Sequence, residues 1–203
     1  MAEPKIRPAR EAGLLLLTAL AAAADAISYL GLGKVFPANM TGNTVLMGIG
    51  LADHDYTGAV RSAVALGGFV TGAAVVGLLW SGRHTRTVYG LGIEAAAITA
   101  AAGLWATLGA TPTGGPRYVL IALLGGAMGA QSGVAAGLRV GVSTTYITGT
   151  WTAVSTGIAG LLRPRRAPRE RTRPGPALWR QIAVVVCYFG AALLSGYLFV
   201  HYI

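Results

Sequence analysis

Seven stretches of mostly apolar residues, separated by short polar or basic stretches, dominate the pattern along this chain. They cover residues 11–32, 37–52, 59–80, 87–109, 117–138, 144–162 and 178–202. A helix needs about 20 apolar residues to cross the hydrocarbon core of a bilayer, and five of the seven stretches are long enough. The pattern predicts an all-α, polytopic membrane helix bundle in which residues 1–203 form a single membrane domain.

Two of the stretches, 37–52 and 144–162, are short and polar for membrane segments. Residues 41–52 make only about 18 Å of helix, whereas the bilayer core is about 30 Å thick. The preceding residues 34–40 contain Pro37 and are expected to be extended. Each short segment therefore either crosses together with its extended approach, or re-enters and returns to the same side.

Comparison of the chain with itself indicates an internal repeat. The stretch ADAIS at 24–28 aligns with AQSGV at 130–134, and MTGN at 40–43 aligns with ITGT at 147–150. Further along, Arg61 aligns with Arg180, Phe69 with Phe189 and Gly77 with Gly196. We interpret residues 11–80 as repeat A, 87–109 as a linker segment and 117–202 as repeat B. Chance matching in Ala- and Gly-rich sequence is the alternative, and the pattern leaves open a parallel or an inverted repeat.

The two Thr-Gly steps, in NMTGN at 39–43 and YITGT at 146–150, each stand where a short helix is expected to begin. Paired helix breaks in repeats are typical of transporter binding sites. The first N–H groups of a helix lack internal partners and carry the positive end of the helix dipole, which favours an anionic or strongly polar group. The alternative is that these residues only cap their helices. The candidate solute-binding residues are Asn39, Thr41, Gly42, Asn43, Tyr146, Thr148, Gly149, Thr150 and Gln131.

Asp25 and Glu94 are the acidic residues that lie well inside apolar stretches. A carboxyl group at membrane depth is costly unless it is paired, faces water or binds a proton. We therefore predict proton coupling at Asp25 and Glu94, with a purely structural carboxyl as the alternative. Gln131 is the neutral repeat partner of Asp25. If all seven segments cross, Asp25 and Glu94 fall at similar depth, which is a modest argument for seven crossings.

The distribution of basic residues predicts the orientation. Seven arginines lie between 163 and 180, most of them in the loop 163–177, and Lys5, Arg7 and Arg10 precede the first segment. Basic loops stay cytoplasmic, so the N-terminus and this loop are both predicted inside a bacterial plasma (inner) membrane. Crossing segments put 12 Lys and Arg inside and four outside, and re-entrant segments put 13 inside and three outside, so charge does not separate the two arrangements. The first apolar stretch is too long for the core of a cleaved signal peptide.

Composition excludes several other classes. The 203 residues are 54% hydrophobic and only 11% charged, which is unlike a disordered chain or a soluble enzyme. The net charge is +9, but the excess of arginine sits in one loop, without a basic face bearing aromatics, so no nucleic-acid partner is predicted. Cys187 is the single cysteine, and no enzyme, metal or cofactor signature is present. Glycines recur every fourth residue at 125, 129, 133, 137 and 141, and again at 68 and 72, which predicts close helix packing within the chain.

Four motifs resemble a known family. DAISYLGLGKVF followed by ANMTGN, and later GAQSG and TTYITGT, are similar to the YoaK family of bacterial inner-membrane proteins. The resemblance covers nearly the whole chain. It implies about six membrane spans and an inner-membrane location, and it supplies no substrate because the family is of unknown function. The Arg- and Pro-rich stretch at 163–176 is expected to be a variable loop.

The leading functional hypothesis is a secondary transporter, or permease, for a small polar or anionic solute, with proton coupling at the buried carboxyl groups. Its site would lie where the two Thr-Gly breaks meet. The alternative is a non-transporting membrane protein of the same architecture, such as a sensor, a scaffold or a partner subunit. The predicted partners are the lipid bilayer and a small polar solute, and assembly into a homo-oligomer is left open.

Overall fold

The computed structural model describes residues 8–79, 83–138, 147–162 and 176–202, and each of the seven predicted segments forms an α-helix there. The predicted all-helical membrane bundle is confirmed. The helices are α1 (Pro8–Gly31), α2 (Met40–Ala52), α3 (Tyr56–Leu79), α4 (Arg83–Ala106), α5 (Gly114–Leu138), α6 (Ile147–Leu162) and α7 (Pro176–Tyr202).

Five helices, α1, α3, α4, α5 and α7, are long and apolar enough to cross a membrane. Their outward faces carry large apolar side chains that no part of the chain covers, such as Leu16 at 71% exposure and Leu78 at 85%. In water such a surface would be unstable, whereas lipid solvates it. The apolar exterior therefore supports a membrane protein.

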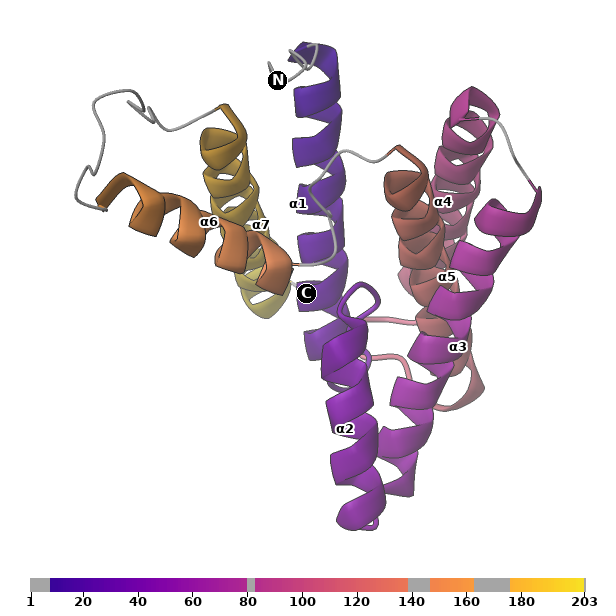
Figure 1. Ribbon diagram of the computed structural model, residues 1–203. Helices are drawn as coiled ribbons and strands as arrows, with labels where there is room; N and C mark the ends of the chain where they lie inside the picture. The colour runs from indigo at the N-terminus through magenta and orange to yellow at the C-terminus, as the bar shows by residue number, and fades with distance from the viewer. Residues whose placement is uncertain (1–7, 80–82, 139–146, 163–175, 203) are drawn as a thin grey trace, which may run out of the picture.

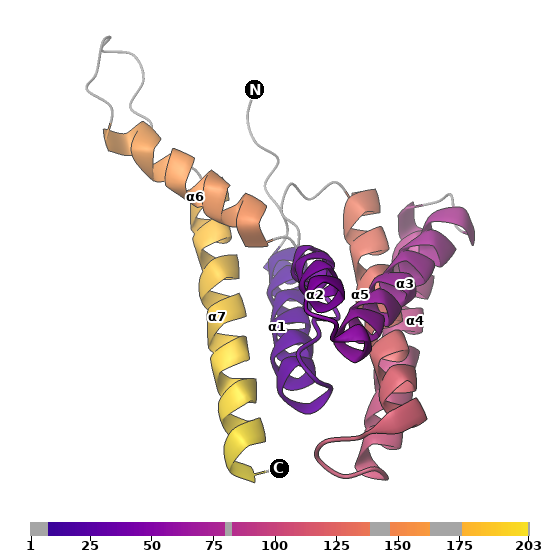
Figure 2. The ribbon, with the colours of Figure 1, turned by 90° about the horizontal axis from the view of Figure 1, so that it is seen from below.

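The helices pack in two groups (Figures 1 and 2). In one group α3 and α4 pack on α5, and α2 packs on α3. In the other α1 and α6 pack on α7, while α1 makes only sparse contact with α5. The first helix of each predicted repeat thus packs on the third helix of the other repeat. A chain with units α1–α3 and α5–α7 would pack in this way if the units were related by approximate symmetry.

Glycines make the α3–α5 contact close. A Cβ atom on Gly68 would lie 2.7 Å from the carbonyl oxygen of Ala122, and one on Gly72 would overlap the carbonyl of Gly126. From the other side, a Cβ on Gly129 would overlap the carbonyl of Phe69. The predicted glycine ridge therefore packs within the chain, backbone against backbone. Gly141, its last predicted member, lies outside the described residues.

The two short helices begin at mid-depth. Figure 1 shows α1 and α5 running in opposite directions, with α2 starting beside the lower half of α1 and running away from the N-terminal end. After α1 the chain turns through Gly33 and Lys34, both with positive φ, and residues 32–39 lead to the start of α2 without helix. The segment 32–52 thus leaves from the end of α1 and returns to that end before α3 begins, which is the path expected for the re-entrant alternative at 37–52.

The structure does not pair the two buried carboxyl groups, so it adds nothing to the depth argument for seven crossings. Asp25 faces α7 and the segment before α2, through hydrogen bonds described below. Glu94 is on α4, which packs on α5 and α3. The two carboxyl groups therefore lie at different helix interfaces, and no hydrogen bond between them requires that they share one depth.

Candidate functional site

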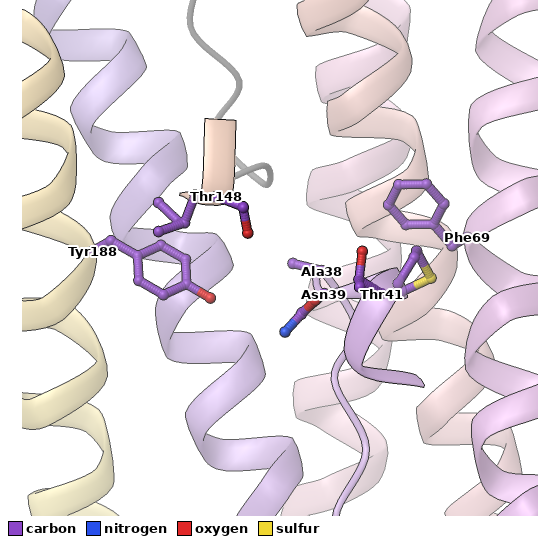
Figure 3. Close-up of a pocket in the computed structure, with 8 residues that line it drawn as sticks. Ala38, Asn39, Thr41, Phe69, Thr148 and Tyr188 are labelled. Atoms are coloured by element: carbon purple, nitrogen blue, oxygen red, sulfur yellow. The ribbon is translucent and has the colours of Figure 1, made fainter. Parts of the chain in front are cut away.

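A pocket of about 340 Å³ lies where the N-terminal ends of α2 and α6 meet (Figure 3). It is lined by residues from four parts of the chain: Ala38, Asn39, Met40, Thr41, Phe69, Ile147, Thr148 and Tyr188. Phe69 lies near the middle of α3, and Tyr188 lies near the middle of α7. Both Thr-Gly breaks therefore border one cavity close to the middle of the bundle.

Several lining residues are ones that the comparison of the chain with itself aligned with each other. Met40 and Thr41 of repeat A correspond to Ile147 and Thr148 of repeat B, with the spacing that aligns the two Thr-Gly motifs. Phe69 and Tyr188 stand the same number of residues after Arg61 and Arg180 respectively. The sequence comparison paired Phe69 with Phe189. The structure corrects this pairing, because Phe189 is 68% exposed on the outer face of α7 whereas Tyr188 lines the pocket.

Hydroxyl, amide and backbone groups give the pocket its polar character. Figure 3 shows the hydroxyl groups of Thr41 and Thr148 directed into the space between α2 and α6. Asn39 is the N-cap of α2, and its Oδ1 accepts a hydrogen bond of 3.0 Å from the backbone N–H of Gly42. The capping role considered for this motif is therefore present at Asn39. Capping and pocket lining coincide there, since the same residue borders the cavity.

Asp25 lies directly behind the lining and is 4% exposed. Its Oδ1 accepts a hydrogen bond of 2.7 Å from the backbone N–H of Ala38, and its Oδ2 accepts one of 2.8 Å from the hydroxyl of Tyr188. Asp25 thus joins three elements: α1, the segment before α2, and α7. A carboxyl that accepts two hydrogen bonds is well satisfied for a buried group.

Asn43 supports the loop before α2 and is fully buried. Its Oδ1 accepts a hydrogen bond of 3.0 Å from the Phe36 N–H, and its Nδ2 donates one of 2.5 Å to the Phe36 carbonyl. Gly42 leaves room for this loop, because a Cβ there would lie 2.9 Å from Asn39 Nδ2 and 3.0 Å from the Phe36 ring. Asn43 and Gly42 shape the site from behind and do not line the pocket.

The remaining predicted binding residues lie beside the pocket or outside the described residues. Gln131 is fully buried on α5, and its Nε2 donates a hydrogen bond of 3.1 Å to the carbonyl of Leu17 on α1. Gly149 and Thr150 continue the first turn of α6, and Thr150 is buried. Tyr146 lies outside the described residues.

Glu94 is 3% exposed, in the half of the bundle formed by α3, α4 and α5. Its Oε1 is buried without a hydrogen-bond partner among the described residues. It does not line the pocket, and it makes no hydrogen bond to the Asp25 cluster. The structure thus brings Asp25 to the Thr-Gly breaks and leaves Glu94 apart from them.

The electrostatics of the pocket come from backbone dipoles and from Asp25. No lining residue is charged. Two helix N-termini point into the cavity, each equivalent to roughly half a positive charge, and one carboxyl lies behind it. In the part of the chain that the structure describes, no group of three or more His, Cys, Asp or Glu side chains could hold a metal ion.

The predicted binding residues left out five of the lining residues: Met40 and Ile147, which stand inside the two quoted motifs, and Ala38, Phe69 and Tyr188. Phe69 and Tyr188 sit in apolar stretches where an aromatic side chain is unremarkable. The signal that could have found them is their equal distance from Arg61 and Arg180, once the third helices are aligned on the two arginines.

Comparisons with known proteins agree with this architecture. Residues 13–203 match the model of a family described as protein of unknown function, DUF1275. The chain is also 32% identical over 185 residues to the transmembrane protein YoaK of Bacillus subtilis, a match that covers 90% of this chain and 81% of that relative. No solved structure matches this chain. The match over nearly the whole length shows that the chain belongs to the DUF1275 family of YoaK-like transmembrane proteins.

Proposed function

We propose that this protein is a secondary transporter for a small polar or anionic solute, and not an enzyme. The observation that carries the proposal is the pocket between the N-termini of α2 and α6. Half-helices that meet at mid-depth offer free N–H groups and positive dipole ends to a solute inside the bilayer. A pocket of about 340 Å³ suits a small molecule.

The packing of the helices supports a mechanism of alternating access. The α1–α6–α7 group and the α2–α3–α4–α5 group contact each other sparsely, and the pocket lies between them. Rocking of one group against the other would open the pocket first to one side and then to the other. The pairwise lining of the pocket supports an inverted repeat, in which each unit contributes a half-helix and an aromatic residue.

Charge and topology support a bacterial inner-membrane location with a cytoplasmic N-terminus. In the five-crossing arrangement, 13 Lys and Arg residues fall on the side of the N-terminus, and Lys34, Arg61 and Arg117 fall on the opposite side. This strong asymmetry is the one that the positive-inside rule describes.

The test is a binding and uptake screen with purified protein, first in detergent and then in proteoliposomes. A panel of small neutral, zwitterionic and anionic solutes is scored for thermal stabilisation and for uptake of radiolabelled solute. A transported solute should stabilise the wild type, and this stabilisation should be lost in Thr41→Val and Thr148→Val, which keep the side-chain shape and remove the pocket hydroxyls.

Matched control variants lie on the same helices as the test residues or next to them. Thr71→Val on α3 and Thr152→Val on α6 remove exposed hydroxyls that donate back to their own helices, at Gly67 and Thr148. Both controls should bind and transport as the wild type does. If no solute of any class binds or moves, the transporter proposal is wrong.

The alternative, a non-transporting membrane protein, is favoured by one observation. The side chains of Asn39 and Asn43 are both used within their own segment, for capping and for loop closure. In a sensor or scaffold, the motif at 39–43 would serve only to form these hydrogen bonds. Solute binding without uptake in the same proteoliposomes would identify such a protein.

A further inference from the structure

We propose that Asp25 and Tyr188 form a hydrogen-bond switch that couples one proton to one anion in the pocket. This inference rests on the proposed transport function and adds its substrate class and its coupling ion. It starts from geometry: Tyr188 borders the cavity, and its hydroxyl lies 2.8 Å from Asp25 Oδ2.

The direction of the Tyr188 hydrogen bond depends on the proton of Asp25. With Asp25 ionised, the phenol donates its single hydrogen to Oδ2 and shows the pocket only a lone pair. With a proton on Oδ2, the carboxylic acid donates to the phenol oxygen, and the phenol hydrogen is free to turn toward the cavity. Oδ1 accepts from the Ala38 N–H in both states, so the proton belongs on Oδ2.

The two states of the switch select different solutes. In the ionised state, the negative charge of Asp25 lies behind the pocket lining, and the phenol of Tyr188 presents a lone pair to the cavity. Both repel an anion that approaches the pocket. After protonation the nearby charge is gone, a hydroxyl donor faces the cavity, and the two helix N-termini remain. The pocket therefore binds an anion with a proton, and releases them together.

The polar groups near Asp25 on the neighbouring elements are neutral, so the switch consists of Asp25 and Tyr188. On α7, Cys187 donates to the carbonyl of Leu15, which precedes Asp25 on α1 by nearly three helical turns. On α5, which contacts α1, the buried polar group Gln131 is neutral and donates to Leu17. The segment before α2 offers the neutral Asn39, and α6 offers the neutral Thr148. Glu94 is on α4, which packs on α5 and α3.

The two residues that align with Asp25 and Tyr188 in the other repeat cannot form the same switch. Gln131 and Phe69 stand where Asp25 and Tyr188 stand in the other half, and neither can exchange a proton. One proton site per pocket predicts a stoichiometry of one proton for each monovalent anion.

The experiment uses methanesulfonate and lactate as anions and dimethyl sulfone as a neutral analogue of similar shape. Calorimetry on the purified full-length protein should show anion affinity rising as the pH falls from 8 to 5.5, by up to about tenfold per pH unit, the limit for one linked proton. Dimethyl sulfone binding should not change with pH. In proteoliposomes loaded with a pH dye, external methanesulfonate should acidify the interior in a way that membrane potential does not alter.

Two variants separate the parts of the switch. Tyr188→Phe removes the donor, so anion affinity at pH 5.5 should fall about ten- to a hundredfold, the effect of one hydrogen bond to a charged group. Asp25→Asn imitates the protonated state, since its amide can donate to the Tyr188 oxygen while its carbonyl accepts from Ala38. It should bind anions equally at all pH values and move no protons. Tyr197→Phe, an exposed tyrosine on the same helix, should behave as the wild type.

The outcomes distinguish this inference from the proposed function. Anion affinity that does not depend on pH in the wild type, or an unchanged anion affinity at pH 5.5 in Tyr188→Phe, would overturn the switch. Failure of the wild type to bind either anion would overturn it too. Uptake of a neutral solute in the earlier screen would still leave the transporter standing.

Discussion

Phe69 of α3 and Tyr188 of α7 face the same pocket from opposite halves of the bundle. Each lies in the third helix of its repeat, at the same distance from the arginine near the start of that helix. The two residues are thus equivalent in position and different in chemistry, because only the tyrosine hydroxyl can bond to Asp25. The pocket is therefore lined by an aromatic residue from each half, and only one of the two carries a polar group.

The glycine contact between α3 and α5 should be sensitive to a single methyl group. Gly72→Ala and Gly129→Ala place a Cβ against a facing carbonyl, so each should destabilise the fold by about 1–3 kcal/mol, the usual cost of overpacking. Gly67→Ala and Gly77→Ala, on the same α3 but facing open space, should leave stability unchanged or slightly raised. Thermal unfolding of the purified variants in detergent measures the difference. Equal midpoints in all four variants would contradict the backbone contact.

The loop before α2 should depend on Asn43. Asn43→Ala leaves the N–H and the carbonyl of Phe36 without their side-chain partner, at a cost of about 1–3 kcal/mol for each orphaned group. The neighbouring Thr44→Ala removes an exposed hydroxyl that bonds to its own helix at Met40, and should be nearly silent. The comparison is made on unfolding midpoints and on the yield of folded protein. A silent Asn43→Ala would show that the loop is held in another way.

The five-crossing topology can be tested with single cysteines in a Cys187→Ser background. An impermeant maleimide added to intact cells should label Asp53→Cys, in the connection between α2 and α3, and should not label Thr85→Cys at the start of α4. Permeabilised cells should show labelling of both. Seven crossings would reverse the two results, because α2 would then end on the cytoplasmic side.

Asp25 should be required for accumulation and dispensable for folding. Asp25→Asn keeps the shape of the side chain and can keep both hydrogen bonds, so its unfolding midpoint should stay near that of the wild type. It cannot cycle a proton, so accumulation of solute under an imposed pH gradient should be abolished. Exchange of labelled for unlabelled solute should continue, since exchange needs no net proton movement. Accumulation equal to the wild type would remove Asp25 from the mechanism.

Glu94→Gln is the matched test at the second buried carboxyl. Glu94 lies away from the pocket, in the half of the bundle where α4 packs on α5 and α3. We therefore expect this variant to accumulate solute under a pH gradient as the wild type does. Loss of accumulation with intact folding would assign Glu94 to the proton path as well.

The sequence by itself determined the seven helical segments, the two short helices and the residues at which those helices begin. These features are local: in lipid the backbone must bond within each apolar segment, and a Thr-Gly step after an extended stretch ends one run of bonds and begins another. The sequence also placed Asp25 at depth, because a single carboxyl stands out in an apolar run.

Only the tertiary structure decided which groups meet. The outer faces of these helices are all apolar, so the sequence does not show that α1 packs on α7 or that α3 packs on α5. That pairing depends on the fit of many small side chains and glycines at once. It sets the re-entry of α2, turns Asn43 toward Phe36, and brings Tyr188 to Asp25 across 163 residues of chain. The chemistry of the site therefore depends on a contact that no local pattern records.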